Sequence, residues 1–118
     1  MKNKAVGLKR IFTAFEFSMK GLRSCYQSET AFRQEVWLAL VLTPLAFILG
    51  DSTIEKIMLI SVIFLVLIVE VLNSAIETVV DRIGNDYHVL SGTAKDMGSA
   101  AVWLSLMLLL ITWLIILI

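Results

Sequence analysis

The stretch VEVLNSAIETVVDR, residues 69–82, gives the strongest indication of both the fold and the function of this chain. It continues a run, residues 57–69, that carries no charged side chain. An α-helix turns by about 100° per residue, so the polar side chains of the stretch share one narrow stripe on an otherwise mostly aliphatic surface. The stripe consists of Glu70, Asn73, Ser74, Glu77 and Asp81. Carboxylates near membrane depth are costly and usually functional. The stretch therefore predicts a membrane helix with a functional polar face, although a buried polar seam that joins helices through Asn73 would give the same pattern.

The composition of the whole chain favours a membrane protein. Its 118 residues are 58% hydrophobic, and the mean hydropathy is +0.88. A soluble domain of this length could not bury so much apolar surface. The formal net charge is zero, but most of the Lys and Arg side chains lie in the first third of the sequence. The single cysteine, Cys25, cannot form a disulfide within the chain, and a small buried residue is a simpler interpretation than a catalytic thiol.

Apolar runs and turn signals predict an all-α membrane protein that forms one membrane domain over residues 1–118. Residues 7–25 place apolar and cationic side chains at helical spacing, which predicts an amphipathic helix in the membrane surface. Three longer apolar segments predict membrane helices over residues 30–50, 54–82 and 92–118. Pro44 is expected to kink the first of these without ending it. Ser28, residues 51–53 and Ser91 are the expected helix caps.

The distribution of charge predicts the orientation in the membrane. The positive-inside rule places the basic N-terminus in the cytoplasm. Residues 51–56 then lie outside and residues 82–95 inside, so residues 29–35 and 70–96 meet at the cytoplasmic face, where ATP is available. From Ile54 to Glu70 a helix rises by about 24 Å. Glu70 is therefore expected near the cytoplasmic edge of the hydrocarbon core, and Glu77 at or beyond that edge.

Three carboxylates, Glu29, Glu70 and Glu77, are predicted to gather at this face. Two of them would suit Mg²⁺, which takes few protein carboxylates and completes its coordination with water and nucleotide phosphate. Glu70 is the candidate general base because it is the least solvated of the three. Lys95 could bind phosphates near the start of the last helix. A solvated first turn would also explain Lys95 and Asp96. His88 is more simply interpreted as a surface residue of a loop. The common nucleotide-binding fingerprints are missing from the sequence.

Three segments resemble the prokaryotic integral-membrane diacylglycerol kinases. They are AFRQE at residues 31–35, VEVLNSAIE at 69–77 followed by VDRIG at 80–84, and AKDMGSAA at 94–101. The likeness covers essentially the whole chain. It implies a homotrimer in the inner (cytoplasmic) membrane, with three spans and a surface helix per chain and with a cytoplasmic N-terminus and active site. It also implies transfer of the γ-phosphoryl group of ATP to the hydroxyl of diacylglycerol, with Mg²⁺ as the cofactor and without a nucleic-acid partner.

The resemblance further implies roles for individual residues, in sites shared between neighbouring subunits. Glu70 matches the general base, Glu29 and Glu77 match the ligands of the magnesium ion, and Asn73 and Lys95 match further catalytic residues. Nucleotide contacts are implied for Arg10, Phe17, Glu29, Glu77, Asp86, Tyr87, His88, Lys95 and Asp96. Lipid contacts are implied for Arg10, Ala31, Phe32, Arg33, Gln34, Glu35, Glu70 and Ser99. The chain departs from the family at Phe17, where relatives often have Tyr, and at Met19, where they often have Trp.

Other functions also have to be weighed. A close branch of the family phosphorylates undecaprenol, and the same carboxylates would serve that hydroxyl equally well. A proton- or cation-conducting oligomer would use Glu70 and Glu77 as relay groups, but residues 57–69 carry Ser61 as their one polar side chain, so the path would stop. A structural assembly subunit would use Asn73 as an interhelical contact, which gives no reason for Glu29, Glu77 and Lys95 to converge.

Overall fold

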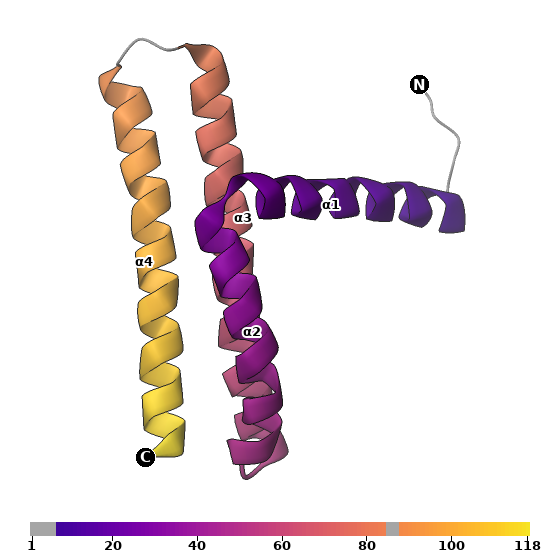
Figure 1. The fold of residues 1–118 in the computed structure, drawn as a ribbon, viewed down its shortest axis with the longest axis vertical. Helices are drawn as coiled ribbons and strands as arrows, with labels where there is room; N and C mark the ends of the chain where they lie inside the picture. Colours follow the sequence, from indigo (N-terminus) through magenta and orange to yellow (C-terminus); the bar gives the residue numbers. More distant parts are fainter. Residues whose placement is uncertain (1–6, 85–87) are drawn as a thin grey trace.

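The computed structural model describes residues 7–84 and 88–118, and this part of the chain is built from helices. Their order is α1 (Leu8–Ser28), α2 (Thr30–Leu49), α3 (Thr53–Ile83) and α4 (Val89–Leu117). Figure 1 shows α2, α3 and α4 running along the long axis of the molecule, while α1 projects away from them to one side. The molecule measures 48 × 42 × 21 Å along its principal axes. The all-α fold predicted from the sequence is confirmed.

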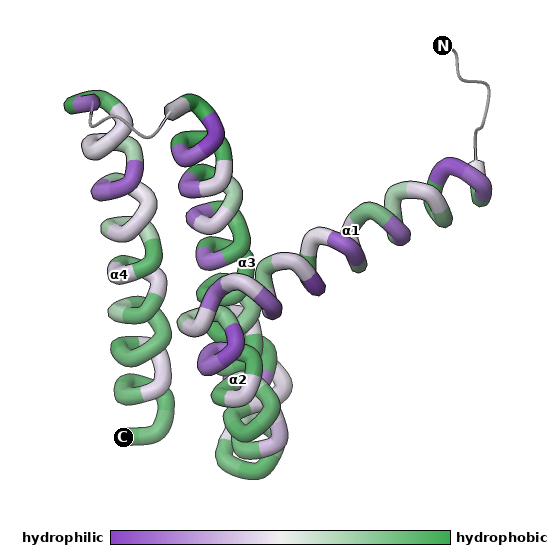
Figure 2. Tube along the Cα trace, turned by 45° about the horizontal axis from the view of Figure 1, so that its top comes forward, coloured by the Kyte–Doolittle hydropathy of each residue, from purple (hydrophilic) through white to green (hydrophobic). Residues whose placement is uncertain are grey.

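Three of these helices are long and apolar enough to cross a membrane. They are α2, α3 and α4, with 20, 31 and 29 residues. At 1.5 Å per residue, helices of this length match or exceed a hydrocarbon core of about 30 Å. In Figure 2 the most hydrophilic segments lie along α1, where α1 joins α2, and toward the ends of α3 and α4 that are connected to each other. The prediction of three apolar membrane helices is confirmed.

Local chemistry sets the ends of α2 and α3. Ser52 caps α3, because its Oγ accepts a hydrogen bond of 3.1 Å from the backbone N–H of Glu55. Pro44 lies inside α2, and the helix continues to Leu49. The expected cap at Ser28 is wrong, because Ser28 still belongs to α1 and its Oγ donates to the carbonyl of Ser24 at 2.8 Å. The helix α1 therefore extends beyond residue 25, where the predicted first helix was expected to end.

The start of α4 also differs from the expectation. The helix begins at Val89 rather than at residue 92. His88 occupies the N-cap position, and its Nδ1 accepts a hydrogen bond of 3.1 Å from the backbone N–H of Leu90. The imidazole nitrogen satisfies one of the backbone donors that a helix start leaves open. Ser91 consequently lies inside the helix rather than capping it.

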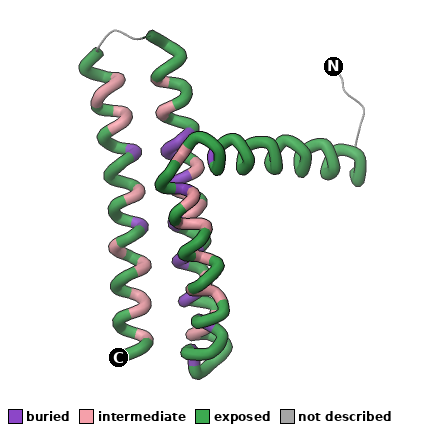
Figure 3. The backbone as a smooth tube through the Cα atoms, viewed as in Figure 1, coloured by how far each residue is buried: buried purple, intermediate pink, exposed green. Residues whose placement is uncertain are grey.

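The centre of the molecule is α3, which packs against both α2 and α4, whereas α1 touches α2 and α3. One face of α3 is buried from Leu59 to Ser74, and Figure 3 shows most of α1 and α4 exposed by comparison. The buried side chains of α3 are Leu59, Val62, Ile63, Val66, Glu70, Asn73 and Ser74. The same face thus changes from apolar to polar at Glu70, and that change fixes where a site can form.

The helix α4 approaches α3 through two small residues, Gly98 and Ser105. Both are buried, whereas Ala101, which lies between them in the sequence, is exposed. Near the other end of the pair, Trp113 Nε1 donates to the carbonyl oxygen of Leu59 at 3.1 Å. The two helices are therefore held together at both the apolar and the polar part of their length.

Candidate active site

The polar stripe of α3 becomes more exposed as the helix approaches its connection to α4. Glu70 is 4% exposed, and Asn73 and Ser74 are each 8% exposed. Glu77 is half-buried and Asp81 is exposed. The five side chains of the stripe therefore share one face but differ sharply in solvation. Burial is costly for the Glu70 carboxylate, because it loses its hydration in an apolar environment.

A second carboxylate reaches Glu70 from α2. The carboxyl groups of Glu35 and Glu70 adjoin one another. Within residues 7–84 and 88–118, one oxygen of each, Oε1, is buried without a hydrogen-bond partner, and so is Oδ1 of Asn73. A buried acceptor without a donor costs about 1–3 kcal/mol. Native proteins rarely leave such buried acceptors without a hydrogen bond. These three oxygens are therefore suited to accept a hydrogen bond from the hydroxyl of a ligand.

Glu29 brings a third carboxylate to the same place. It is the single residue between α1 and α2, with an extended backbone of φ −116° and ψ 109°. Partial burial raises the pKa of the Glu29 carboxyl above its ordinary value, and the negative charges of Glu77, Glu70 and Asp81 raise it further. Glu29 therefore lies close enough to the polar stripe of α3 for its charge to interact with those of Glu70, Glu77 and Asp81 within one chain.

A buried thiol joins α1 to the stripe. Cys25 is 5% exposed, and its Sγ donates to Ser74 Oγ at 3.4 Å. Burial raises the pKa of the Cys25 thiol above its ordinary value. A protonated thiol is a weak nucleophile, which agrees with the interpretation of Cys25 as a small buried residue.

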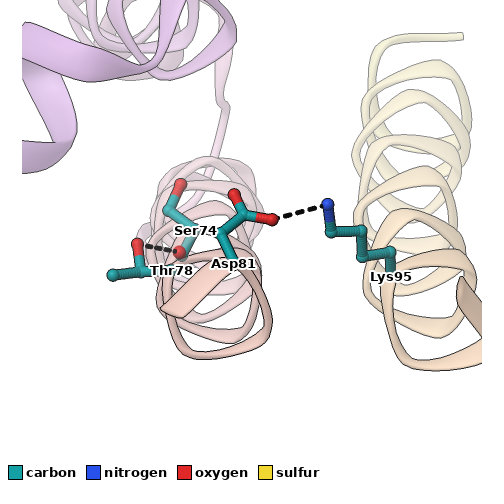
Figure 4. A network of polar contacts seen from close by, with 4 residues as sticks. All are labelled: Ser74, Thr78, Asp81 and Lys95. Atoms are coloured by element: carbon teal, nitrogen blue, oxygen red, sulfur yellow. Dashed lines mark hydrogen bonds and ion pairs between the residues drawn. The ribbon is translucent and has the colours of Figure 1, made fainter. Parts of the chain in front are cut away.

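The helix α4 contributes a cation to the more exposed end of the stripe. Lys95 Nζ pairs with Asp81 Oδ1 at 2.7 Å, and both side chains keep substantial exposure. Figure 4 shows this pair bridging α3 and α4, next to Thr78, whose Oγ1 donates to the carbonyl of Ser74 at 2.8 Å. Exposed ion pairs contribute little to stability, so Lys95 would lose little by exchanging Asp81 for a phosphate.

The approach of α4 to α3 depends on Gly98. A Cβ atom built at this position would meet the side-chain carboxamide of Asn73. The glycine therefore lets the two helices come together at the level of the buried acceptor oxygens. Ser99, the next residue, is exposed, and so is Asp96 one turn earlier.

An apolar groove of about 710 Å³ lies between α1, α2 and α3. Sequence analysis named one of its residues, Phe32, and missed the others. The helix α3 carries apolar side chains at helical spacing beside the polar stripe. That periodicity is the sequence pattern from which this face of the groove could have been predicted. The lining consists of Leu22, Arg23, Tyr26, Gln27, Phe32, Val36, Phe64, Leu67, Ile68, Val71 and Leu72.

Several predicted site residues are not brought to this cluster within one chain. Arg10 and Phe17 are exposed on α1, which projects away from the other helices (Figure 1). Arg33 turns toward the end of α1, while Ala31 and Gln34 are exposed on α2. Two further predicted nucleotide contacts, Asp86 and Tyr87, lie outside the described residues.

The donor set fits a magnesium ion that arrives with a nucleotide. The described part of the chain contains no group of three or more His, Cys, Asp or Glu side chains arranged to hold a metal. Magnesium typically uses one or two protein carboxylates and takes its other ligands from water and phosphate. Glu29 and Glu77, which lie close enough for their charges to interact, would supply two hard oxygen ligands of this kind.

The fold and the site define a class of protein: a small membrane protein with three apolar helices, which has buried carboxylates on α2 and α3 and an apolar groove between α1, α2 and α3. Comparison with known proteins narrows this class. Residues 16–117 match the family described as prokaryotic diacylglycerol kinase. The chain belongs to this family, and the resemblance seen in its sequence is confirmed.

Individual relatives agree over almost the full length. The chain is 51% identical over 117 residues to a diacylglycerol kinase of Escherichia coli strain K12, covering 99% of this chain and 96% of that protein. It is 50% identical over 110 residues to a diacylglycerol kinase of Haemophilus influenzae, covering 93% of each. A diacylglycerol kinase of Pseudomonas aeruginosa is 50% identical over 107 residues, covering 91% of this chain and 87% of that protein.

Proposed function

We propose that this chain transfers the γ-phosphoryl group of ATP to the free hydroxyl of diacylglycerol and so produces phosphatidic acid. Membership of the family and the shared name of its relatives support this activity. The structural observations that carry the proposal are the buried acceptor oxygens of Glu35, Glu70 and Asn73, which lack donors, and the apolar groove that the same two helices, α2 and α3, form with α1. A lipid alcohol supplies the missing donor, and its acyl chains suit the apolar groove.

Glu70 is the general base of this reaction. The hydroxyl oxygen of the lipid forms a bond to the γ-phosphorus, the bond from that phosphorus to the bridging oxygen breaks, and ADP leaves. The hydroxyl proton passes to Glu70, which is the most buried carboxylate of the stripe. Asn73 and Glu35 hold the hydroxyl in line with the phosphorus, since positioning provides most of the catalysis in phosphoryl transfer. Ser99, Ala31, Phe32, Arg33, Gln34 and Arg10 remain proposed lipid contacts.

Glu29 and Glu77 hold the Mg²⁺ that accompanies ATP. When bound, this ion neutralises charge on the β- and γ-phosphates. Lys95 leaves Asp81 and binds a phosphate oxygen, which the exposure of the ion pair makes inexpensive. The nucleotide contacts of Arg10, Phe17, Asp86, Tyr87, His88 and Asp96 belong to the same proposal.

The working form is a homotrimer with sites shared between subunits, each chain acting as one membrane domain. The projection of α1 away from its own bundle supports sharing, because Arg10 would have to serve a neighbouring chain. The helix α1 lies in the membrane surface as an amphipathic helix, which its alternation of exposed apolar and cationic side chains supports. The basic N-terminal third favours an inner membrane location with the site facing the cytoplasm.

The test is a phosphoryl-transfer assay with the purified protein in lipid vesicles. Magnesium-ATP with a labelled γ-phosphate is supplied together with either diacylglycerol or undecaprenol. The expected result is labelled phosphatidic acid, formed faster than labelled undecaprenyl phosphate. Faster turnover of undecaprenol would assign the acceptor to the other branch of the family, and failure to phosphorylate either lipid would refute the kinase proposal.

A further inference from the structure

The guanidinium group of Arg33, in the first turn of α2, is bonded to the last turn of α1. Its Nη1 donates to the carbonyl oxygens of Tyr26 at 2.7 Å and Gln27 at 3.0 Å. Its Nη2 donates to Thr30 Oγ1 at 3.1 Å. One side chain thus joins the end of one helix to the start of the next, and these four residues are called the corner below.

These contacts meet a need that the end of α1 creates. The last carbonyl groups of an α-helix have no partner within the helix. The carbonyl of Cys25 is satisfied by the backbone N–H of Glu29 at 2.9 Å, and Arg33 satisfies the two that follow. A cation is favoured at a helix C-terminus, and charge-assisted hydrogen bonds are stronger than neutral ones. A planar fork can reach several acceptors at once, which the point charge of a lysine cannot do equally well.

The corner determines where Glu29 lies. Glu29 alone separates α1 from α2, so the angle between the two helices and the direction of its side chain are set together. Other tethers flank the corner. Trp37 Nε1 donates to Tyr26 Oη at 3.2 Å, and Cys25 Sγ donates to Ser74 Oγ at 3.4 Å. The backbone at Glu29 is thereby fixed at the corner, where the charge of Glu77 acts on the Glu29 carboxylate.

We propose that Arg33 is a positioning residue, which clamps the corner so that Glu29 and Glu77 face one another as a pair of metal ligands. This role differs from the lipid contact that family resemblance implies for Arg33. It rests on the proposed function, in which Glu29 and Glu77 hold the magnesium of magnesium-ATP. The clamp itself is a statement about geometry and can be tested without turnover.

The geometric test measures the distance between α1 and α2 in the full-length protein in vesicles. Spin labels are attached at Phe12→Cys and Leu40→Cys, both exposed positions, in a Cys25→Ser background that keeps a donor for Ser74. Labelled chains are diluted with unlabelled protein so that each measured distance lies within one chain. Arg33→Gln is expected to broaden and shift the distance distribution, and Arg33→Lys to restore it only in part. Lys9→Gln, which removes a cation from the exposed first turn of α1, should leave the distribution unchanged. An unchanged distribution in Arg33→Gln would overturn the clamp.

The kinetic test separates positioning from lipid binding. Arg33→Gln should raise the Mg²⁺ concentration for half-maximal rate by about tenfold, the factor that roughly 1.4 kcal/mol of lost positioning gives. The KM for diacylglycerol should stay close to that of the unmodified protein. If Arg33 instead contacts the lipid, the KM for diacylglycerol will rise and the Mg²⁺ requirement will not change, which would contradict the proposal.

A double-mutant cycle links the clamp to its target. Because Arg33 acts through Glu29, adding Arg33→Gln to Glu29→Gln should cause little further rise in the Mg²⁺ requirement, whereas independent effects would add. Full additivity would overturn the proposed route through Glu29. If Glu29→Gln by itself leaves the Mg²⁺ requirement unchanged, the metal assignment and the proposed metal-positioning role fail together, while a shifted label distance still supports the geometric clamp.

Discussion

Among single residues, solvation separates the carboxylates of the stripe, in the order that their depths predicted from the sequence imply. Glu70 is almost fully buried, whereas Glu77, two turns further along the same face, is half-buried. A buried carboxylate lacks solvent that would compete for a substrate hydroxyl, and a half-exposed one is open to a hydrated ion. This difference underlies the assignment of Glu70 as base and Glu77 as metal ligand.

The assignment of Glu77 predicts a specific kinetic defect. Glu77→Gln keeps the shape of the side chain but removes a charged ligand, so the Mg²⁺ concentration for half-maximal rate should rise, with a smaller effect on the KM for diacylglycerol. Titration of the initial rate with Mg²⁺ at fixed ATP measures the change. Glu16→Gln, an exposed acid on α1, is the matched control. An unchanged dependence on both Mg²⁺ and ATP would remove Glu77 from the metal site.

The buried thiol of Cys25 should be unreactive. Because burial hides the sulfur and raises its pKa, alkylation by a maleimide at pH 8 should be much slower than alkylation of an exposed cysteine. The matched control is Ser18→Cys, an exposed position on α1, in a Cys25→Ser background. Mass spectrometry of samples quenched over time gives both rates. Equal rates would show that α1 does not rest on α3 at Ser74.

Among the helices, the close approach of α4 to α3 is the contact most sensitive to a single added carbon. A methyl group at Gly98 would displace the carboxamide of Asn73, which is the end of a short side chain, so the fold should survive. We expect Gly98→Ala to lower kcat markedly. The free energy of unfolding should fall by no more than about 1–3 kcal/mol. Turnover and thermal unfolding of the same samples measure the two effects.

The control for Gly98→Ala is Ala101→Val, which adds bulk at an exposed position on α4. It should change neither turnover nor unfolding temperature appreciably. A Gly98→Ala variant with the kcat of the unmodified protein would mean that the position of Asn73 does not matter for the reaction.

Local pattern was enough to predict the helices but not their mutual contacts. The apolar runs and the period of the stripe predict that Glu70, Asn73 and Ser74 share a face, and that face is buried. The pair of Cys25 and Ser74 joins residues 49 positions apart, and no local pattern encodes it. Arg33 was assigned to the lipid by resemblance alone, since its partners become visible only once α1 is known to extend to Ser28.

At the scale of the whole molecule, the polar groups of four helices converge where a lipid alcohol and a nucleotide could meet. The groove opens between α1, α2 and α3, and the polar stripe of α3 ends at the exposed pair of Lys95 and Asp81. Figure 1 places the start of α1 far from this convergence. The proposed nucleotide contact of Arg10 therefore requires a neighbouring chain.

Shared sites predict complementation between defective chains. Arg10→Gln and Glu70→Gln should each impair turnover, but trimers assembled from a mixture of the two should regain part of the activity, because some sites then combine an intact Arg10 with an intact Glu70. The measurement is turnover after the two variants are denatured, mixed and refolded together. Each variant treated alone is the control. Mixed samples no more active than the sum of the separate ones would argue against sharing.

The proposed reaction depends on the buried carboxylate of Glu70 taking the proton from the lipid hydroxyl. The most direct measurement compares the unmodified protein with Glu70→Gln at saturating magnesium-ATP and diacylglycerol, following labelled phosphatidic acid and, separately, the affinity for ATP. General base catalysis contributes about 10²- to 10⁴-fold, so the variant should be slower by at least about 10²-fold while binding ATP almost as tightly. A variant that forms phosphatidic acid at nearly the normal rate would contradict the account.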